Sequence, residues 1–132
     1  MDRAELVDVV REVAAEAIAI EPERVLADSN LYDLGAQSLE FLDIVFKLEQ
    51  RYDIEITRGE MERAARGDMS EDEFAPDGVI SEVGLERLRE LMPESSARIV
   101  PGLRVSQILS LFSVTTFARI VENKLASQTP AS

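Results

Sequence analysis

Residues 33–52 are the most informative stretch of this 132-residue chain and read DLGAQSLEFLDIVFKLEQRY. Gly35 ends a loop, and from Ser38 onward apolar residues recur at helical spacing. One apolar stripe comprises Phe41, Ile44, Val45, Leu48 and Tyr52, and a neighbouring stripe comprises Leu39, Leu42 and Phe46. The pattern predicts a helix of about 15 residues that begins at Ser38 and has more than one apolar surface to cover.

Helical patterns flank this stretch on both sides. Asp2 and Glu5 form a capping box for a first predicted helix, which ends before Pro22 and carries Leu6, Val9, Val10, Val13, Ala17 and Ile20. A final helix is predicted to begin with Thr115 or Thr116 as its cap and to carry Phe117, Ile120, Val121 and Leu125. Loop 21–37 contains four large apolar residues, so we expect it to pack against the helices.

Short elements are predicted between these helices. Capping boxes begin at Thr57 and Ser70, with Gly67 as a stop between them. Another helix is predicted to end at Pro93, followed by a polar connector at 94–98 and a short helix up to Phe112. Few segments alternate with a period of two, so we predict an all-α fold. We expect a single domain at 1–126 and a disordered tail at 127–132.

Composition narrows the possible function classes. The chain contains no cysteine and no histidine, which excludes disulfides, thiolate ligands, a Ser-His-Asp triad and His-based zinc sites. Its acidic clusters lack the spacing of an EF-hand loop, so we predict no metal site. No apolar run reaches about 18 residues, so we predict no stable membrane insertion.

The charge of the chain indicates the kind of partner. Acidic residues outnumber basic ones by 26 to 14, and the first 57 residues hold 14 acidic and 5 basic side chains. Such a chain repels nucleic acid, so we predict protein partners with basic patches and no nucleic-acid partner. The start of the chain lacks the basic and apolar segments of a signal peptide, which favours a cytoplasmic location.

The residues alone leave two interpretations of Ser38 open. Its hydroxyl suits a helix N-cap, where it would accept a hydrogen bond from a backbone N–H. It also suits covalent attachment, because a phosphodiester at this corner would meet the free N–H groups and the positive end of the helix.

The residues around Ser38 resemble a known family. The sequence Gly35-Ala36-Gln37-Ser38-Leu39 and the helix that follows are similar to the phosphopantetheine attachment site of acyl carrier proteins. Residues 28–35 resemble the family's loop into its second helix, and residues 112–121 resemble the start of its last helix. The similarity covers residues 2–57 and about 103–125.

The resemblance implies an acyl-carrier-type four-helix bundle with additional short helices inserted between the second and the last helices. It implies a carrier and not an enzyme. Ser38 would hold a 4′-phosphopantetheine arm, whose thiol carries an acyl chain as a thioester to fatty-acid or lipid biosynthetic enzymes. The implied partners are a phosphopantetheinyl transferase, acyl-handling enzymes with basic patches and the acyl chain, and the implied partner-binding residues are Leu39, Glu40, Asp43 and Phe46. We expect a monomer.

Two departures from the family bear on this interpretation. Gln37 stands where the family usually has an aspartate that helps to dock the transferase, which keeps open an alternative, an unmodified helical adaptor that binds a basic protein. The insertion at about 58–102 is longer than in ordinary carriers. It resembles the specialised, enlarged carriers for very long or unusual acyl chains, including those of lipid A synthesis. Its helices either enlarge a slot for the acyl chain or only cover a wide apolar surface.

Overall fold

The computed structural model describes residues 3–128, and for Arg58, Ser127 and Gln128 it describes the backbone alone. This part of the chain is helical, with two isolated bridges and no strand. The helices are α1 (Arg3–Ile18), η1 (Pro22–Arg24), α2 (Ser38–Tyr52), α3 (Arg58–Arg66), α4 (Glu71–Phe74), α5 (Glu82–Leu91), η2 (Pro93–Arg98), η3 (Val105–Leu111) and α6 (Val114–Gln128), where η denotes a 3-10 helix. The predicted all-α fold with extra short helices is confirmed.

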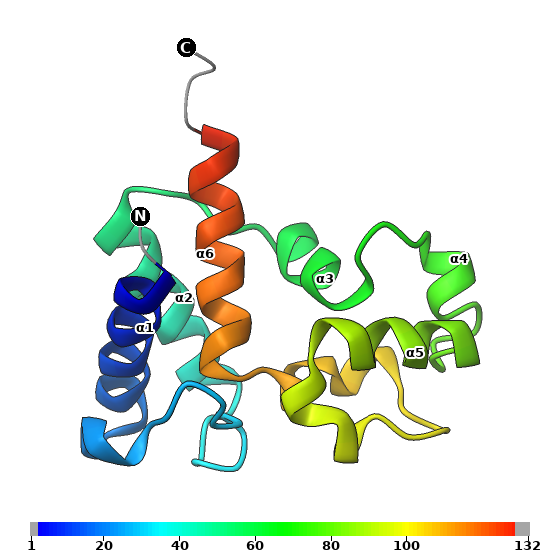
Figure 1. Ribbon diagram of the computed structural model, residues 1–132, viewed down its shortest axis with the longest axis horizontal. Helices are drawn as coiled ribbons and strands as arrows, with labels where there is room; N and C mark the ends of the chain where they lie inside the picture. Colours follow the sequence, from blue (N-terminus) through cyan, green and yellow to red (C-terminus); the bar gives the residue numbers. More distant parts are fainter. Residues whose placement is uncertain (1–2, 129–132) are drawn as a thin grey trace.

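The long helices α1, α2 and α6 form a bundle (Figure 1). Helix α1 packs against both α2 and α6, because its apolar residues at spacings of three and four face inward. An aromatic cluster of Phe41, Phe112 and Phe117 fills one end of this core. The Phe117 ring stacks on Phe41 at 6.2 Å and meets Phe112 edge-on at 5.5 Å.

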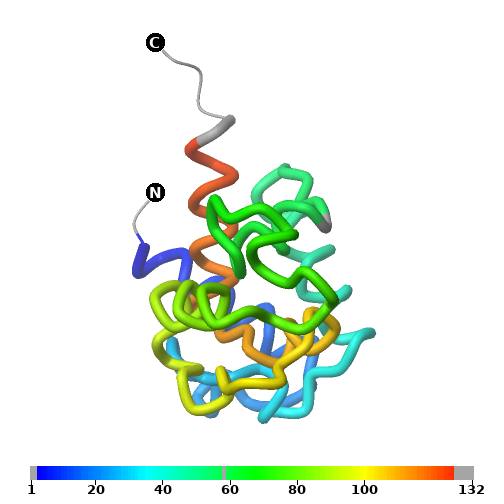
Figure 2. Tube along the Cα trace, turned by 90° about the vertical axis from the view of Figure 1, so that its right-hand side faces the viewer, coloured from blue at the N-terminus to red at the C-terminus, as the bar shows by residue number. Residues whose placement is uncertain are grey.

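The inserted region, residues 58–102, lies beside the bundle and holds α3, α4, α5 and η2 (Figures 1 and 2). Helix α5 is its centre, since it packs against α3, α4 and η2. Gly84 permits the close approach of α4 to α5. A Cβ atom at this position would lie 2.6 Å from the carbonyl oxygen of Phe74, so a larger residue would push the helices apart.

Polar contacts join the inserted region to α6. The guanidinium of Arg119 donates hydrogen bonds to the carbonyl oxygens of Leu91 at 2.5 Å and Ala64 at 2.7 Å. Burial lowers the pKa of Arg119 from its usual value. The Lys124 ammonium lies 3.0 Å from a Glu60 carboxylate oxygen. These contacts place a partly buried cation, Arg119, where α3, α5 and α6 meet.

Several predicted boundaries need correction. Ser113 and not Thr115 or Thr116 caps α6, because the Ser113 hydroxyl accepts from the Thr116 N–H and the Thr116 hydroxyl accepts from the Ser113 N–H, both at 3.2 Å. The predicted polar connector at 94–98 belongs to η2. Helix α6 runs through Gln128, two residues into the predicted tail. Asp2 of the predicted first capping box and residues 129–132 lie outside the described residues.

Candidate functional site

Ser38 is the first residue of α2, as the sequence predicts. The residue before it, Gln37, has an extended backbone and occupies the cap position, and its N–H donates to a Glu40 carboxylate oxygen at 2.8 Å. The interpretation of Ser38 as the N-cap is therefore wrong, because its backbone is already helical and a capping residue must be extended. The Ser38 side chain is exposed, and its hydroxyl has no hydrogen-bond partner within residues 3–128.

The loop before Ser38 is fixed by buried contacts. Leu31 is fully buried, and its N–H donates to the carbonyl oxygen of Phe112 at 3.1 Å. The Asn30 side-chain amide donates to the carbonyl oxygen of Ser110 at 2.7 Å. Gly35 then turns the chain with a φ of +106°, a conformation that suits glycine. The start of α2 is thereby held against the end of η3.

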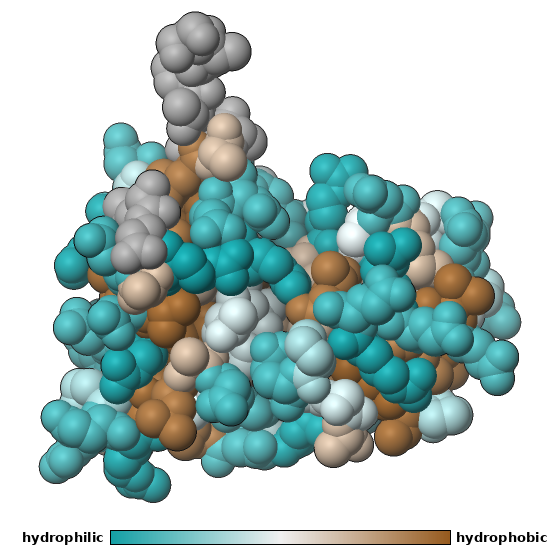
Figure 3. Space-filling view, viewed as in Figure 1, coloured by the Kyte–Doolittle hydropathy of each residue, from teal (hydrophilic) through white to brown (hydrophobic). Residues whose placement is uncertain are grey.

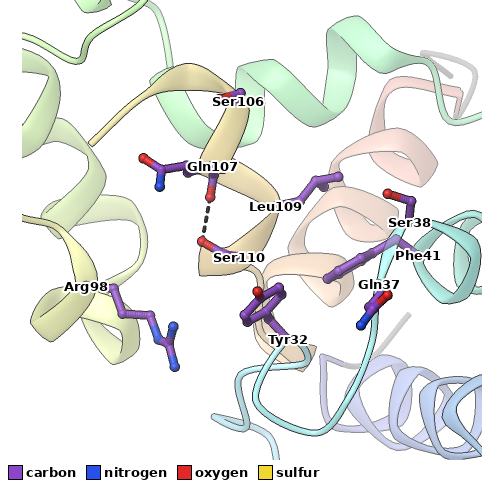
Figure 4. A pocket seen from close by; sticks show the side chains of 9 residues that line it. All are labelled: Tyr32, Gln37, Ser38, Phe41, Arg98, Ser106, Gln107, Leu109 and Ser110. Carbon is purple, nitrogen blue, oxygen red and sulfur yellow. Dashed lines mark hydrogen bonds between the residues drawn. The ribbon is translucent and has the colours of Figure 1, made fainter. Parts of the chain in front are cut away.

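A cavity of about 640 Å³ opens beside Ser38. Its walls come from two distant parts of the chain, the loop with the start of α2 on one side and η2 with η3 on the other (Figure 4). Phe41 points into this space below Ser38, and the Ser110 hydroxyl donates to the carbonyl oxygen of Gln107 at 2.6 Å along η3. The remaining lining residues are Tyr32, Gln37, Arg98, Ser106 and Leu109. Polar and apolar groups are both within reach of a group bound to Ser38.

The charged residues around Ser38 have partners. Arg98 forms an ion pair with Asp33 at the edge of the cavity. Lys47 lies 3.9 Å from Asp43 and 2.9 Å from Glu16, and its hydrogen bond to Glu16 raises the pKa of Lys47. Lys47, nine residues along α2 from Ser38, therefore offsets part of the negative charge of Asp43 and Glu16.

The predicted partner-binding residues lie on one accessible side of α2, but their exposure differs. Leu39 exposes 76% and Phe46 56% of its surface, whereas Glu40 and Asp43 are partly buried. Leu42 lies in the same stripe and exposes 65%, although it was not among the predicted contacts. Leu42 follows Leu39 by three residues, and this helical spacing identifies it as part of the same exposed stripe. The most accessible surface next to Ser38 is therefore apolar.

Sequence reasoning missed the residues that complete the cavity. Tyr32, Arg98 and the η3 residues Ser106 and Leu109 carry no motif, and only the folded chain brings them to Ser38. Within residues 3–128, no group of three or more acidic side chains is arranged to hold a metal ion. No helix of the described part is both long and apolar enough to cross a membrane.

Comparison with known proteins identifies similar sequences. Residues 8–65 match the family described as phosphopantetheine attachment site. An acyl carrier protein of Sulfurovum sp. (strain NBC37-1) is 41% identical over 61 residues, which cover 46% of this chain and 81% of that protein. An acyl carrier protein of Campylobacter curvus (strain 525.92) is 39% identical over 57 residues, which cover 42% of this chain and 74% of that protein. No solved structure gives a significant match.

Proposed function

Since the chain belongs to the acyl carrier protein family and carries covalent 4′-phosphopantetheine, we propose that Ser38 is the attachment residue. Proteins of this family are carriers and not enzymes. The observation that supports Ser38 is its geometry: an exposed hydroxyl without a hydrogen-bond partner in the described chain, at the start of α2 and beside a cavity of about 640 Å³. A modifying enzyme can reach such a hydroxyl.

The residues present suit a phosphodiester at this position. Ser38 Oγ would form the ester bond to the phosphate, and the first N–H groups of α2 have no helical acceptors, so they stabilise its negative charge. Tyr32, Phe41 and the polar side chains of η3 would border the attached group. When bound, the arm supplies the terminal thiol that carries an acyl group as a thioester.

The chain would present this acyl group to enzymes of fatty-acid or lipid biosynthesis. Leu39, Glu40, Asp43 and Phe46 would form the docking surface for a phosphopantetheinyl transferase and for acyl-handling enzymes with basic patches. The exposure of Leu39 and Phe46 supports this assignment. The match to the Sulfurovum protein covers less than half of this chain, and the additional residues support a specialised, enlarged carrier, with lipid A synthesis as one pathway. We propose that it acts as a cytoplasmic monomer.

Intact-mass measurement after co-expression with a phosphopantetheinyl transferase tests the attachment residue. Wild-type protein should gain the mass of one arm, and Ser38→Ala should gain none. Ser106→Ala is the matched control, because Ser106 is an exposed serine that lines the same cavity. A mass gain in Ser38→Ala, or no gain in wild-type protein with any transferase, would contradict the assignment.

Gln37 supports a second candidate function, an unmodified helical adaptor that binds a basic protein. The side chain of Gln37 lies next to Ser38 and lines the same cavity, at the position where the family usually has an acidic transferase contact. Gln37→Asp separates the two functions. If the carrier function holds, the transferase modifies both wild-type protein and Gln37→Asp, and it modifies the variant faster. If modification occurs in the variant and never in wild-type protein, the adaptor is favoured.

A further inference from the structure

A second cavity, of about 370 Å³, lies where α3, α5 and α6 meet, and we call it the junction cavity. It shares no lining residue with the cavity beside Ser38. Helix α3 packs against both α5 and α6, so the inserted region and the bundle each supply part of the wall (Figure 1). The proposed carrier function makes no use of this cavity.

Arg119 brings a partly buried positive charge to the junction cavity. Its guanidinium donates to the backbone carbonyl oxygens of Leu91 and Ala64, and no carboxylate within residues 3–128 lies at ion-pair distance from it. Burial lowers the pKa of Arg119, and the attraction of the Glu94 carboxylate does not offset this effect. Because a desolvated cation without an anionic partner is costly, an anion bound in the cavity would stabilise it.

Arg63 provides a second cation on the α3 side of the junction cavity. Its side chain is exposed and forms no hydrogen bond or ion pair with the part of the chain that the structure describes. The other charged lining residues are Lys124 and Glu60, which pair at 3.0 Å, and the exposed Asp68. The cavity is therefore locally cationic, although acidic residues outnumber basic ones by 26 to 14 in the whole chain.

The junction cavity also has an apolar wall. Ala64, Leu91 and Ile120 line it between the charged residues, and none of the three is fully exposed. Pockets that combine apolar walls with a few polar groups are typical of small-molecule sites, and a volume of about 370 Å³ is enough for a small organic molecule. A ligand with an anionic group and an apolar body would match both kinds of surface.

We infer that the junction cavity binds a small organic phosphate monoester, with Arg63 and Arg119 on the phosphate and the apolar wall on the organic part. Such a phosphate carries about two negative charges near neutral pH, which two arginines can balance. The forked guanidinium donors also match the spacing of phosphate oxygens. A soluble ligand is favoured over a lipid headgroup, because the net charge of −12 repels an anionic membrane.

A bound phosphate would connect the two regions of the molecule. Arg63 lies on α3 and Arg119 on α6, so an anion between them would hold the inserted region against the bundle. A ligand that binds only the closed junction stabilises it by mass action. Amide hydrogen exchange in α3 should therefore slow when the ligand is added, more than exchange in α1.

Phenyl phosphate is the probe for this site, because it joins a phosphate monoester to an apolar ring. In a titration of the full chain followed by amide NMR, resonances of Ala64, Gly67 and Leu91 should shift and saturate at one ligand per chain. Benzoate, which has the ring but a single negative charge, and inorganic phosphate, which has no ring, should both bind several-fold more weakly. Equal affinity for benzoate, or no shift at these three amides, would overturn the inference.

Charge reversal at Arg63 tests the site without disturbing the fold. Arg63→Glu should weaken the binding of phenyl phosphate about tenfold or more, since a charge-assisted hydrogen bond is replaced by repulsion. Arg24→Glu is the matched control, because Arg24 is exposed on η1 and the change in net charge is the same. Arg119 is kept, since its substitution would also remove the contacts to Leu91 and Ala64. Equal affinities of the two variants would overturn the inference.

Two further samples separate this site from a membrane and from the proposed attachment residue. Vesicles that contain phosphatidic acid present the same phosphate chemistry on a lipid surface, and they should not bind the protein. Binding to these vesicles without a response to phenyl phosphate would overturn the soluble ligand. Ser38→Ala should bind phenyl phosphate as wild-type protein does, so this test stands whether or not Ser38 carries the arm. Loss of binding in Ser38→Ala would place the ligand beside Ser38 and overturn the inference.

Discussion

The bundle and the inserted region are held together by different interactions. In the bundle, helices of 15 and 16 residues bury apolar stripes around an aromatic cluster. In the inserted region, Ala65 is the one fully buried side chain among those that the structure describes in the nine-residue α3. This helix is fixed to α6 through Arg119 and the pair of Lys124 with Glu60. On the face shown in Figure 3, apolar side chains surface in both regions within a mostly polar coat.

This difference indicates that the two regions have separate roles. The closely packed bundle fixes the start of α2 and therefore the position of Ser38. The inserted region leaves cavities along η3 and is attached by contacts that can be removed one at a time. Substitutions in the two regions should then have separable effects on global stability and on the local stability of the insertion.

Truncation of the aromatic cluster should have the largest effect. Phe117→Ala removes a fully buried ring and leaves a cavity, so we expect the free energy of unfolding to fall by about 3–5 kcal/mol. Leu109→Ala, at a partly exposed position beside existing cavities, should cost about 1 kcal/mol or less. Chemical denaturation measures both values. Similar losses for the two variants would contradict the contrast between a filled bundle core and the cavities along η3.

Removal of the Arg119 guanidinium should have the second-largest effect, at the junction of α3, α5 and α6. Arg119→Met keeps much of the side-chain stem but leaves the carbonyl oxygens of Leu91 and Ala64 without this donor, at an expected cost of about 1.5–3 kcal/mol. Amide hydrogen exchange should accelerate more in α3 and α5 than in α1 and α2. Arg63→Met, at an exposed position of α3, is the control. Uniform acceleration over the whole chain would show that the inserted region does not open by itself.

The smallest effect should come from Glu60 and should depend on pH. Partial burial alone would raise the pKa of Glu60, but hydrogen bonds from Lys124 and Thr57 more than offset it and lower the pKa. The carboxylate therefore stabilises the fold above its unfolded-state pKa of about 4.3, and this contribution is lost as the pH falls through the folded-state pKa.

Glu60→Gln should therefore cost about 1 kcal/mol or less near neutral pH and nothing in acid. Denaturation of both proteins across a pH series measures the difference. Glu122→Gln provides the counterpart in the bundle, because a hydrogen bond from Arg3 lowers the pKa of Glu122 and gives the same direction. A difference for Glu60→Gln that grows in acid would contradict the assigned direction.

The sequence predicted what local signals encode. Apolar spacing located the long helices, and the capping boxes at Thr57 and Ser70 placed the starts of α3 and α4. The end of α1 was harder to predict from the sequence, because the apolar Ile20 indicated a longer helix. The chain instead leaves the helix at Ala19, which has a left-handed φ of +65°, and the Ile20 N–H donates back to the carbonyl oxygen of Ala15.

The site was predictable only in part, for the same physical reason. Ser38 and its flanks form a contiguous motif, so the proposed attachment point can be read from the sequence. The cavity beside it joins Tyr32 to residues near position 107, and that proximity depends on tertiary packing. The sequence did not reveal the cap at Gln37, because the backbone N–H of Gln37 and the carboxylate of Glu40 form it. The Ser38 hydroxyl takes no part in it.

Mass spectrometry of the protein purified from its native cells, with fragmentation to locate the modified residue, is the decisive test of attachment at Ser38. We predict one 4′-phosphopantetheine arm, free or acylated, on Ser38 of each modified chain. A chain that is always unmodified in those cells, or an arm on any other residue, would contradict it.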